Sequence, residues 1–423
     1  MVPAVPSVPS VPSVAFVLVT TTTIAPMKPG DEITITPTEL VAGGAALARV
    51  DGLPVFVSGL YPGDVAVVRI TEAKKGFTRG ELVRLLEPSA LRRALPCPVA
   101  DECGGCDWTA LRLDAQLRAK ERILRESLRR IGKIDPASLP PIAVHPSPLN
   151  YRLRSRLHRD GNDIGFFATR SNRVVPLSSE CEVVGVETAR TVGSGASNVA
   201  GTRSSASAAH DGGADALLRV PTTSTDLEIW ELHGQLITDQ REITIPVEDF
   251  TFTLSTDSFF QVNRHLLGTM LRLVRQHAER CPEKTSAIDL YAGAGFFTAP
   301  LARIFDRVTA VEGSAVSARW AKRNTSANVR IVNQPVEQYA NQMARADFVF
   351  LDPPRSGVRT NVIESIAERA GSMICFLACD PVTFSRDASR LIASGWRLST
   401  LDLLDLFPNT HHVETLSSFE RAP

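Results

Sequence analysis

The sequence predicts an α/β protein with a Rossmann-like sheet at the C-terminus, preceded by a small β-barrel and a central β domain. Residues 28–90 contain short β-branched runs separated by Gly, Pro and Asp turns, which is the pattern of a small barrel. Residues 287–290 are expected to form a buried strand that leads into the glycine turn 293–295, as in nucleotide-binding folds. Two later apolar runs, 347–351 and 373–378, each end in a polar motif, as strands of a doubly wound sheet do.

Length and composition set broad limits on organisation and class. A chain of 423 residues has room for two or three domains, each with its own core. The formal net charge is zero, so any affinity for nucleic acid must come from local basic patches. No apolar run approaches the roughly 20 residues of a membrane-spanning helix. No Lys or Arg precedes Lys28, so the basic N-terminal region of a secretory signal is missing. We therefore expect a cytoplasmic monomer with no membrane association.

The first 27 residues are excluded from the predicted fold. Val-Pro-Ser repeats run through Ser13 and a threonine run follows, and such low complexity cannot bury a core. Residues 1–27 are therefore expected to be a disordered leader, or an over-extended start of the reading frame with Met27 as the true first residue. The predicted barrel follows at residues 28–90.

A cluster of cysteines predicts a metal centre in the central domain, residues 91–255. Cys97, Cys103 and Cys106 have the spacing C-x5-C-x2-C, and Cys181 lies far downstream. In a cytosolic chain such cysteines indicate metal binding rather than disulfides. Zinc sites usually pair short C-x2-C motifs, whereas an iron–sulfur cube accepts three near ligands and one remote ligand. The spacing favours a [4Fe–4S] cluster over zinc, and four unrelated buried cysteines are the remaining alternative.

Two basic segments of this domain favour RNA as the partner. Residues 111–131 are predicted to form a helix because their apolar residues recur every three to four positions. In residues 151–159 Arg alternates with apolar residues, which predicts a strand with one arginine face suited to phosphate contacts. Residues 191–215 are rich in Gly, Ser and Ala and are predicted to be a flexible insertion. The other faces of the predicted helix carry six basic residues: Arg118, Lys120, Arg122, Arg125, Arg129 and Arg130.

The last predicted domain, residues 256–423, has the pattern of a nucleotide-cofactor site. After the glycine turn we expect a helix at 298–304 and a second strand, 308–312, that ends in Glu312. Glycines let a cofactor approach the backbone, and an acid at the end of the second strand binds ribose hydroxyls. Thr298 occupies the third glycine position of the dinucleotide fingerprint, so S-adenosylmethionine is favoured over NAD.

Catalytic candidates follow the two later strands. The strand 347–351 delivers Asp352 and Arg355, and the strand 373–378 delivers Cys379 to the same edge of the sheet. A thiol at a strand end, near helix N-termini and an arginine, can be held partly as thiolate. Taken alone, Cys379 would be read as a packing residue, and its position beside Asp352 favours a nucleophile instead.

Together these motifs resemble the RNA uracil-5-methyltransferases, the family that makes 5-methyluridine in tRNA and in 23S rRNA. The resemblance implies a class I methyltransferase sheet preceded by a TRAM (OB-like) barrel and an iron–sulfur domain. A TRAM barrel together with a cluster is similar to the 23S rRNA enzymes of this family. The matching segments keep the family order over residues 28–421: the four cysteines, 257–263, 289–295, 352–355, the loop around Cys379, and 406–414.

The resemblance also implies roles for single residues. Cys379 would add to C6 of uracil, C5 would attack the cofactor methyl group, and Glu414 would then remove the C5 proton. Phe259 matches a position that stacks near a flipped-out base, and Arg355 would offset developing negative charge. The positions that match cofactor contacts are Gln261, Tyr291, Phe296, Glu312 and Asp352.

Two positions depart from the family pattern. The family often has Ser-Cys-Asn-Pro where this chain has Ala-Cys-Asp-Pro at 378–381, so Asp380 is expected to raise the thiol pKa or to change a loop hydrogen bond. Pro335 stands near the place where a contact with the cofactor adenine is expected, which leaves that contact open.

The predicted function is therefore S-adenosylmethionine-dependent methylation of uridine C5 in RNA, with 23S rRNA as the preferred substrate and uridine 54 of tRNA as the alternative. A cytosine-5 RNA methyltransferase typically carries a cysteine in the motif that here reads Asp-Pro-Pro-Arg at 352–355. A non-catalytic RNA-binding or assembly protein would have no chemical need of Cys379, Asp352 and Glu414 together. An NAD-linked oxidoreductase ranks last.

Overall fold

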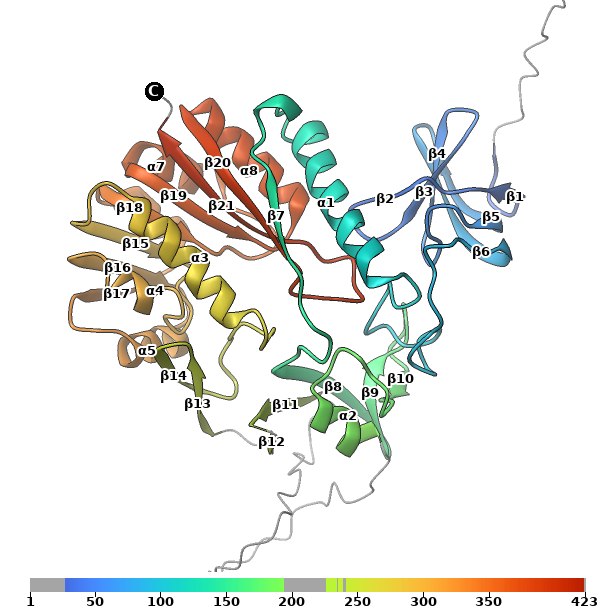
Figure 1. Ribbon diagram of the computed structural model, residues 1–423, viewed down its shortest axis with the longest axis horizontal. Coiled ribbons are helices and arrows are strands. Elements are labelled where there is room, and N and C mark those ends of the chain that lie inside the picture. Colours follow the sequence, from blue (N-terminus) through green and yellow to red (C-terminus); the bar gives the residue numbers. More distant parts are fainter. Residues whose placement is uncertain (1–26, 194–225, 234, 239–240, 422–423) are drawn as a thin grey trace, which may run out of the picture.

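The computed structural model describes residues 27–193, 226–233, 235–238 and 241–421 (Figure 1). The predicted leader up to residue 26 and the predicted insertion from residue 194 onward lie outside these ranges. Within them the strands form four sheets. None of the helices in this part of the chain combines the length and the apolar character that crossing a membrane requires.

The N-terminal sheet has six strands in the order β1-β5-β6-β4-β3-β2. Its strands are antiparallel neighbours except for β4 and β6, which run parallel. Alternate residues of β5 (Ala66, Val68 and Ile70) are buried, as expected for a strand with one face on a core. The strands are β1 (Glu32–Ile35), β2 (Glu39–Leu40), β3 (Ala46–Val50), β4 (Leu53–Val57), β5 (Val65–Lys74) and β6 (Phe77–Glu87).

The central sheet, in the order β10-β9-β8-β11-β12, differs from the predicted arginine face. Arg154 and Arg156 of β8 both pair with Glu228 of β11, because β8 and β11 are antiparallel neighbours. Part of the predicted phosphate-binding charge is therefore neutralised within the sheet. The elements of this region are β8 (Arg154–Asp160), β9 (Asp163–Phe167), β10 (Val174–Pro176), α2 (Val186–Gly193), β11 (Asp226–Leu232) and β12 (Gln235–Ile237).

The largest sheet has eight strands in the order β17-β16-β15-β18-β19-β21-β20-β7. The run from β17 to β19 is parallel, β21 is antiparallel to both β19 and β20, and β7 is parallel to β20. The middle parallel strands β18 and β19 are mostly apolar and buried because both faces are covered, whereas the edge strand β17 is only partly buried. The strands are β7 (Ile142–His145), β15 (Ser286–Leu290), β16 (Arg307–Glu312), β17 (Val329–Asn333), β18 (Ala346–Leu351), β19 (Ala370–Ala378), β20 (Trp396–Leu404) and β21 (Glu414–Arg421).

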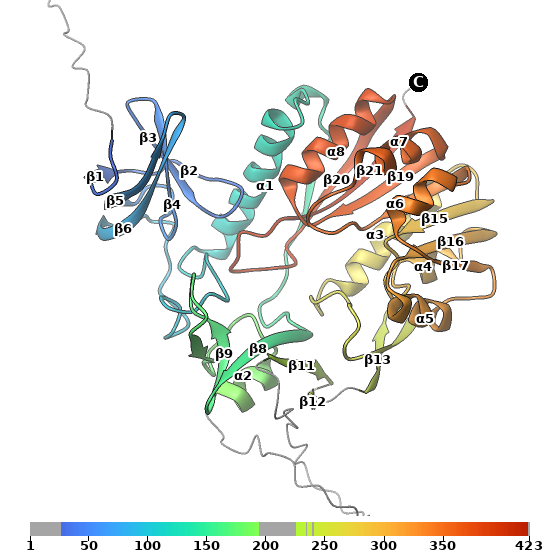
Figure 2. The ribbon, with the colours of Figure 1, turned by 180° about the vertical axis from the view of Figure 1, so that it is seen from behind.

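Helices cover both faces of this sheet. Figures 1 and 2, taken from opposite sides, show α3, α4 and α5 over one face and α7 and α8 over the other, with α1 beside α8. The two-stranded sheet of β13 (Glu242–Val247) and β14 (Phe250–Ser255) contacts α5. The helices are α1 (Leu113–Arg130), α3 (Leu267–Arg280), α4 (Thr298–Leu301), α5 (Ala315–Asn324), α6 (Val336–Tyr339), α7 (Thr360–Arg369) and α8 (Pro381–Ala393), with short 3-10 turns at Pro136–Ser138 and Ala340–Gln342.

The helix α1 has the predicted position, but most of its basic residues are buried or paired. Lys120 is fully buried rather than part of a solvated basic face. Arg125 pairs with Glu121, and Arg129 and Arg130 both pair with Glu126 on the same helix. Intrahelical pairs three and four positions apart satisfy these side chains locally. The helix therefore offers less charge to RNA than its sequence indicates.

Candidate active site

One cavity of about 700 Å³ lies at the carboxyl ends of β15, β16, β18 and β19, where ligands bind in doubly wound sheets. Its size suits a nucleotide-sized cofactor with part of a second substrate. The structure brings all nine predicted active-site residues to its wall: Phe259, Gln261, Tyr291, Phe296, Glu312, Asp352, Arg355, Cys379 and Glu414.

The glycine turn after β15 forms one end of this cavity. Gly293 and Gly295 have φ values of 56° and 87°, which favour glycine, and Tyr291 also has a positive φ of 64°. The Gly293 N–H donates to the Glu312 carboxylate at 2.8 Å, and the N–H of Ser314 donates to its other oxygen at 2.7 Å. Two backbone donors therefore orient the carboxylate at the end of β16 toward the turn.

Aromatic side chains line the neighbouring wall in two ways. Phe259 is 61% exposed, so its ring is available to a ligand. Phe296 is buried and packs against Phe252, Phe260 and Phe297, with ring centroids about 5 Å apart. Phe296 thus shapes the cavity from its core side.

Buried carboxyl groups make the next part of the site electrically unusual. Burial raises the pKa of Asp352 to about 7, and a hydrogen bond from the Gln261 side-chain amide, 3.0 Å long, opposes this shift. Burial likewise raises the pKa of Asp289 to about 8, opposed by a hydrogen bond from Thr298. Near neutral pH Asp352, which lines the cavity, is close to half-protonated, whereas Asp289, below the glycine turn, is mostly protonated.

The sheet register places Cys379 beside Glu414. Ala378, the last residue of β19, is opposite Thr415 of antiparallel β21. Cys379, which follows β19, and Glu414, the first residue of β21, therefore meet at the sheet edge. Burial, Glu414 and Asp352 raise the pKa of Cys379 to about 12, against a smaller lowering by Arg355. Burial and Asp352 also raise the pKa of Glu414 well above its usual range. In the free protein the Cys379 thiol therefore carries its proton at neutral pH, and its surroundings favour the neutral form of Glu414.

Arg355 is held by a residue that the sequence analysis did not single out. Its Nη2 lies 3.3 Å from Nε2 of His412. Burial, together with His411 and Arg355, lowers the pKa of His412 to about 3, so the imidazole is neutral and accepts from the guanidinium. His412 lies in a segment quoted for its motif, and only the fold brings it to Arg355.

The four predicted cysteine ligands line a second, small cavity. Cys97, Cys103, Cys106 and Cys181 are free thiols on its wall, together with Glu182 and Asn409 among others. Burial raises the pKa of Cys106 to about 12. Across the described residues, no three His, Cys, Asp or Glu side chains form a set that could hold a single metal ion. The four thiols nevertheless line one shared cavity. Four cysteine sulfurs are the donor set that an iron–sulfur cube requires.

Comparisons with known proteins agree with these features. A family model described as TRAM domain matches residues 26–83, and one described as tRNA (Uracil-5-)-methyltransferase matches 232–347 and 336–421. An uncharacterized RNA methyltransferase of Gloeobacter violaceus is 30% identical over 93% of this chain and 97% of its own length. The 23S rRNA (uracil(1939)-C(5))-methyltransferase RlmD of Edwardsiella ictaluri is 30% identical over 92% of this chain and 95% of its own. The chain belongs to the RNA uracil-5-methyltransferase family.

A solved structure extends the likeness to the fold. The tRNA (uracil-54, C5)-methyltransferase of Pyrococcus abyssi, in complex with S-adenosyl-L-homocysteine, aligns with a TM-score of 0.68 over 91% of this chain and 99% of that chain, at 20% identity. The predicted family, the class I methyltransferase fold and the TRAM domain are confirmed. The iron–sulfur cluster and the roles of single residues stay predictions.

Asp380, where this chain departs from the family pattern, caps a helix. Its Oδ1 accepts from the Thr383 N–H at 2.7 Å at the N-terminus of α8, and Pro381 occupies the first turn. Of the two expected effects, the structure shows the loop hydrogen bond. The raised pKa of Cys379 has burial and the carboxyl groups of Glu414 and Asp352 as its main causes.

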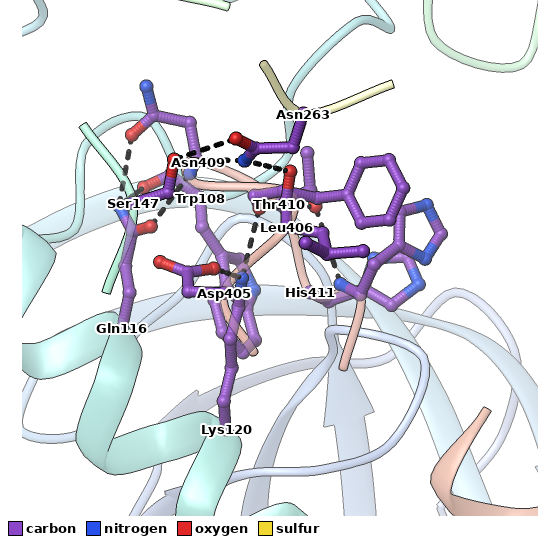
Figure 3. Close-up of polar contacts among 12 residues, drawn as sticks. Trp108, Gln116, Lys120, Ser147, Asn263, Asp405, Leu406, Asn409, Thr410 and His411 are labelled. Carbon is purple, nitrogen blue, oxygen red and sulfur yellow. Dashed lines mark hydrogen bonds and ion pairs between the residues drawn. The ribbon is translucent and has the colours of Figure 1, made fainter. Parts of the chain in front are cut away.

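The family motif at 406–414 lies in a loop whose anchors sequence reasoning missed. This 405–413 loop connects β20 to β21 and contacts α1 and the segment before it (Figure 3). Lys120 donates to Asp405 at 2.6 Å and to the carbonyl of Phe407 at 2.9 Å. Asn263 donates to the carbonyl of Leu406 at 2.8 Å. The apolar period of α1 offered a signal, because it places Lys120 on the same side as Ile123 and Leu124.

Proposed function

We propose that this protein transfers a methyl group from S-adenosylmethionine to C5 of uridine in RNA, through a transient bond between Cys379 and C6 of the base. The observation that carries the proposal is the meeting of Cys379 and Glu414 at one sheet edge, in the same cavity as the glycine turn and Asp352. A nucleotide cofactor and a pyrimidine can share that cavity. Family membership supports the same activity.

Each step assigns one task to a residue of this chain. The Cys379 thiol loses its proton to solvent water, and its sulfur gives an electron pair to C6, so that the C5–C6 π pair moves toward C5 and the carbonyl oxygen. S-adenosylmethionine, when bound, would supply an electrophilic methyl group that bonds to C5, with S-adenosylhomocysteine as the leaving group. The Glu414 carboxylate then takes the C5 proton, the C5–C6 double bond re-forms, and the sulfur leaves with its electron pair.

The raised pKa values fit this order of events. A thiol that is protonated in the free protein cannot react until a bound base and cofactor change its surroundings. Asp352 and Glu414 are the carboxyl groups whose charges act on it, and Arg355 acts in the opposite direction. The positive charge of bound S-adenosylmethionine would lower the pKa values of Cys379, Asp352 and Glu414.

A pair of substitutions tests the chemistry. Cys379→Ala is expected to abolish 5-methyluridine formation and leave S-adenosylmethionine binding nearly unchanged. Glu414→Gln is expected to accumulate a covalent RNA–protein adduct, seen as a shifted band on denaturing gels. Cys375→Ala serves as the matched control, because Cys375 is a fully buried thiol on β19, the strand that precedes Cys379. Turnover by the Cys379→Ala protein would exclude the proposed nucleophile.

We further propose 23S rRNA as the preferred substrate. The support is the 30% identity to the Edwardsiella ictaluri enzyme over most of both chains, together with the TRAM match. Mapping 5-methyluridine in rRNA and tRNA from a deletion strain tests this choice. Loss of the modification from tRNA alone would favour uridine 54 of tRNA as the substrate instead.

We propose that the four cysteines hold a [4Fe–4S] cluster. The support is their gathering around one cavity, with the uneven spacing of three near ligands and one remote ligand. Protein purified without oxygen is expected to be brown and to contain iron and acid-labile sulfide. Colourless protein with stoichiometric zinc would reject the cluster.

A further inference from the structure

Asn409, in the 405–413 loop, has an unusually complete set of polar contacts for one buried residue. Its exposed fraction is 0%, and its φ of 67° lies in the left-handed region that Asn tolerates better than most residues. Its backbone N–H donates to Gln116 at 2.8 Å, and its carbonyl accepts from Trp108 at 3.0 Å. Residues far earlier in the chain therefore fix both the backbone and the position of this loop.

The side-chain amide of Asn409 can take only one orientation. Its Oδ1 accepts from Gln116 and from Arg93, both at 3.0 Å, and its Nδ2 donates to Glu182 at 2.8 Å. Two donors face the oxygen and a carboxylate faces the nitrogen. Arg93 also pairs with Glu182 at 2.6 Å. A carboxylate at position 409 would keep its contact with Arg93 but would place a second negative charge at hydrogen-bond distance from Glu182.

These contacts connect the loop to the cysteine cavity. Glu182 follows Cys181, and both Glu182 and Asn409 lie on the wall of that cavity. A second connection joins Asp107, which follows Cys106, to the backbone N–H and the ring of His411. The loop is thus attached at two points to residues adjacent to the cysteines.

The same loop ends at Glu414, the first residue of β21. We propose that Asn409 is a positioning residue, which fixes Glu414 for removal of the C5 proton by holding the loop to Glu182. This inference rests on the proposed function, because it concerns the step assigned to Glu414. Lys120 holds the Asp405 end of the loop, and Asp107 holds His411. Loss of the Asn409 contact is therefore expected to shift the loop between these two anchors, and Glu414 with it, while the rest of the fold persists.

The decisive experiment exchanges the two groups in contact. Asn409→Asp keeps the size of the side chain and opposes two carboxylates, so kcat is expected to fall by about 100-fold, the effect of a misplaced catalytic group. The RNA–protein adduct is expected to accumulate, as with Glu414→Gln, and the KM for S-adenosylmethionine is expected to stay unchanged. Adding Glu182→Gln restores one amide facing one carboxylate with the original net charge. The double variant is therefore expected to recover kcat and lose the adduct.

A purely structural role for Asn409 predicts a different pattern. It would lower kcat, cofactor affinity and the melting temperature together, without adduct and without rescue by Glu182→Gln, and that result overturns the inference. Unchanged kcat in the Asn409→Asp protein also overturns it. If that protein does not fold, Asn409→Gly retains the positive φ and the backbone contacts and must itself accumulate adduct. Wild-type turnover and the Glu414→Gln adduct test the proposed function separately, so the two failures are distinguishable.

Discussion

The buried ion pair between Lys120 and Asp405 provides the sharpest test of how α1 stabilises the catalytic sheet. Lys120 is fully buried and Asp405 is 4% exposed, and the Nζ–Oδ1 distance is 2.6 Å. Burial lowers the pKa of Lys120, and the charge and hydrogen bond of Asp405 oppose that shift. The proposed change is Lys120→Met, which keeps the length of the side chain and removes the charge.

Lys120→Met leaves a buried carboxylate without its cation and removes one donor to the Phe407 carbonyl, which keeps its bonds from Thr410. Breaking one partner of a buried pair costs about 3–5 kcal/mol of unfolding free energy. Adding Asp405→Asn removes the uncompensated charge, so the double variant is expected to recover most of this loss. The unfolding free energy lost in Lys120→Met is thus expected to come mainly from the broken ion pair, and less from the packing of the lysine stem.

Unfolding in denaturant, compared at equal protein concentration, measures the effect. The control is Arg125→Met on the same helix, because Arg125 has 45% of its side chain exposed and pairs with Glu121 at 2.9 Å. Exposed pairs contribute at most about 1 kcal/mol, so this variant should stay close to wild type. A Lys120→Met protein as stable as the Arg125→Met protein would refute the argument that the carboxylate is charged and shielded from water.

Two other predictions concern groups whose environment the structure defines. The raised pKa of Asp289, about 8, means that its contribution to stability is present below its ordinary pKa and is lost as the pH rises through 8. Asp289→Asn is expected to remove this loss of stability with rising pH. If the melting temperature changed equally between pH 6 and 9 in the wild-type and Asp289→Asn proteins, the prediction would be wrong. Asp380→Ala removes the cap of α8 and is expected to cost about 1 kcal/mol, whereas Asp380→Asn should be nearly neutral. Chemical denaturation of both variants checks this, and equal losses would exclude capping as the cause.

The strand-end groups of the active site were predictable from the sequence alone. Asp352 and Cys379 each follow an apolar run, and parallel strands end at the same edge of a sheet. Glu312 follows the same rule at the end of β16. Glu414 does not, because it begins a strand that runs antiparallel to its neighbours, so only the family resemblance indicated its place.

Contacts between distant segments could not be read from local patterns. Basic residues on a helix usually point to solvent, and for that reason Lys120 was predicted to be exposed, like the five arginines of the same helix. The apolar period of α1 indicates the buried side of the helix, but the group that pairs with the Lys120 charge, Asp405, lies 285 positions later in the chain and cannot be inferred from it. The arginines of β8 were likewise predicted to face phosphate, since the sequence does not indicate that Glu228 lies on the adjacent strand.

The catalytic sheet is completed by residues that precede it in the chain. The strand β7, from the predicted central domain, covers the edge of β20, and His145 at its end contacts Asp402 at 2.8 Å. An uncovered edge strand would leave backbone groups unpaired and open to association. Together with α1, which packs on α8, β7 makes residues 113–145 part of the support of β20. Since the 405–413 loop leaves from β20 and delivers Glu414, the same early residues that stabilise the sheet also determine where the proposed base can stand.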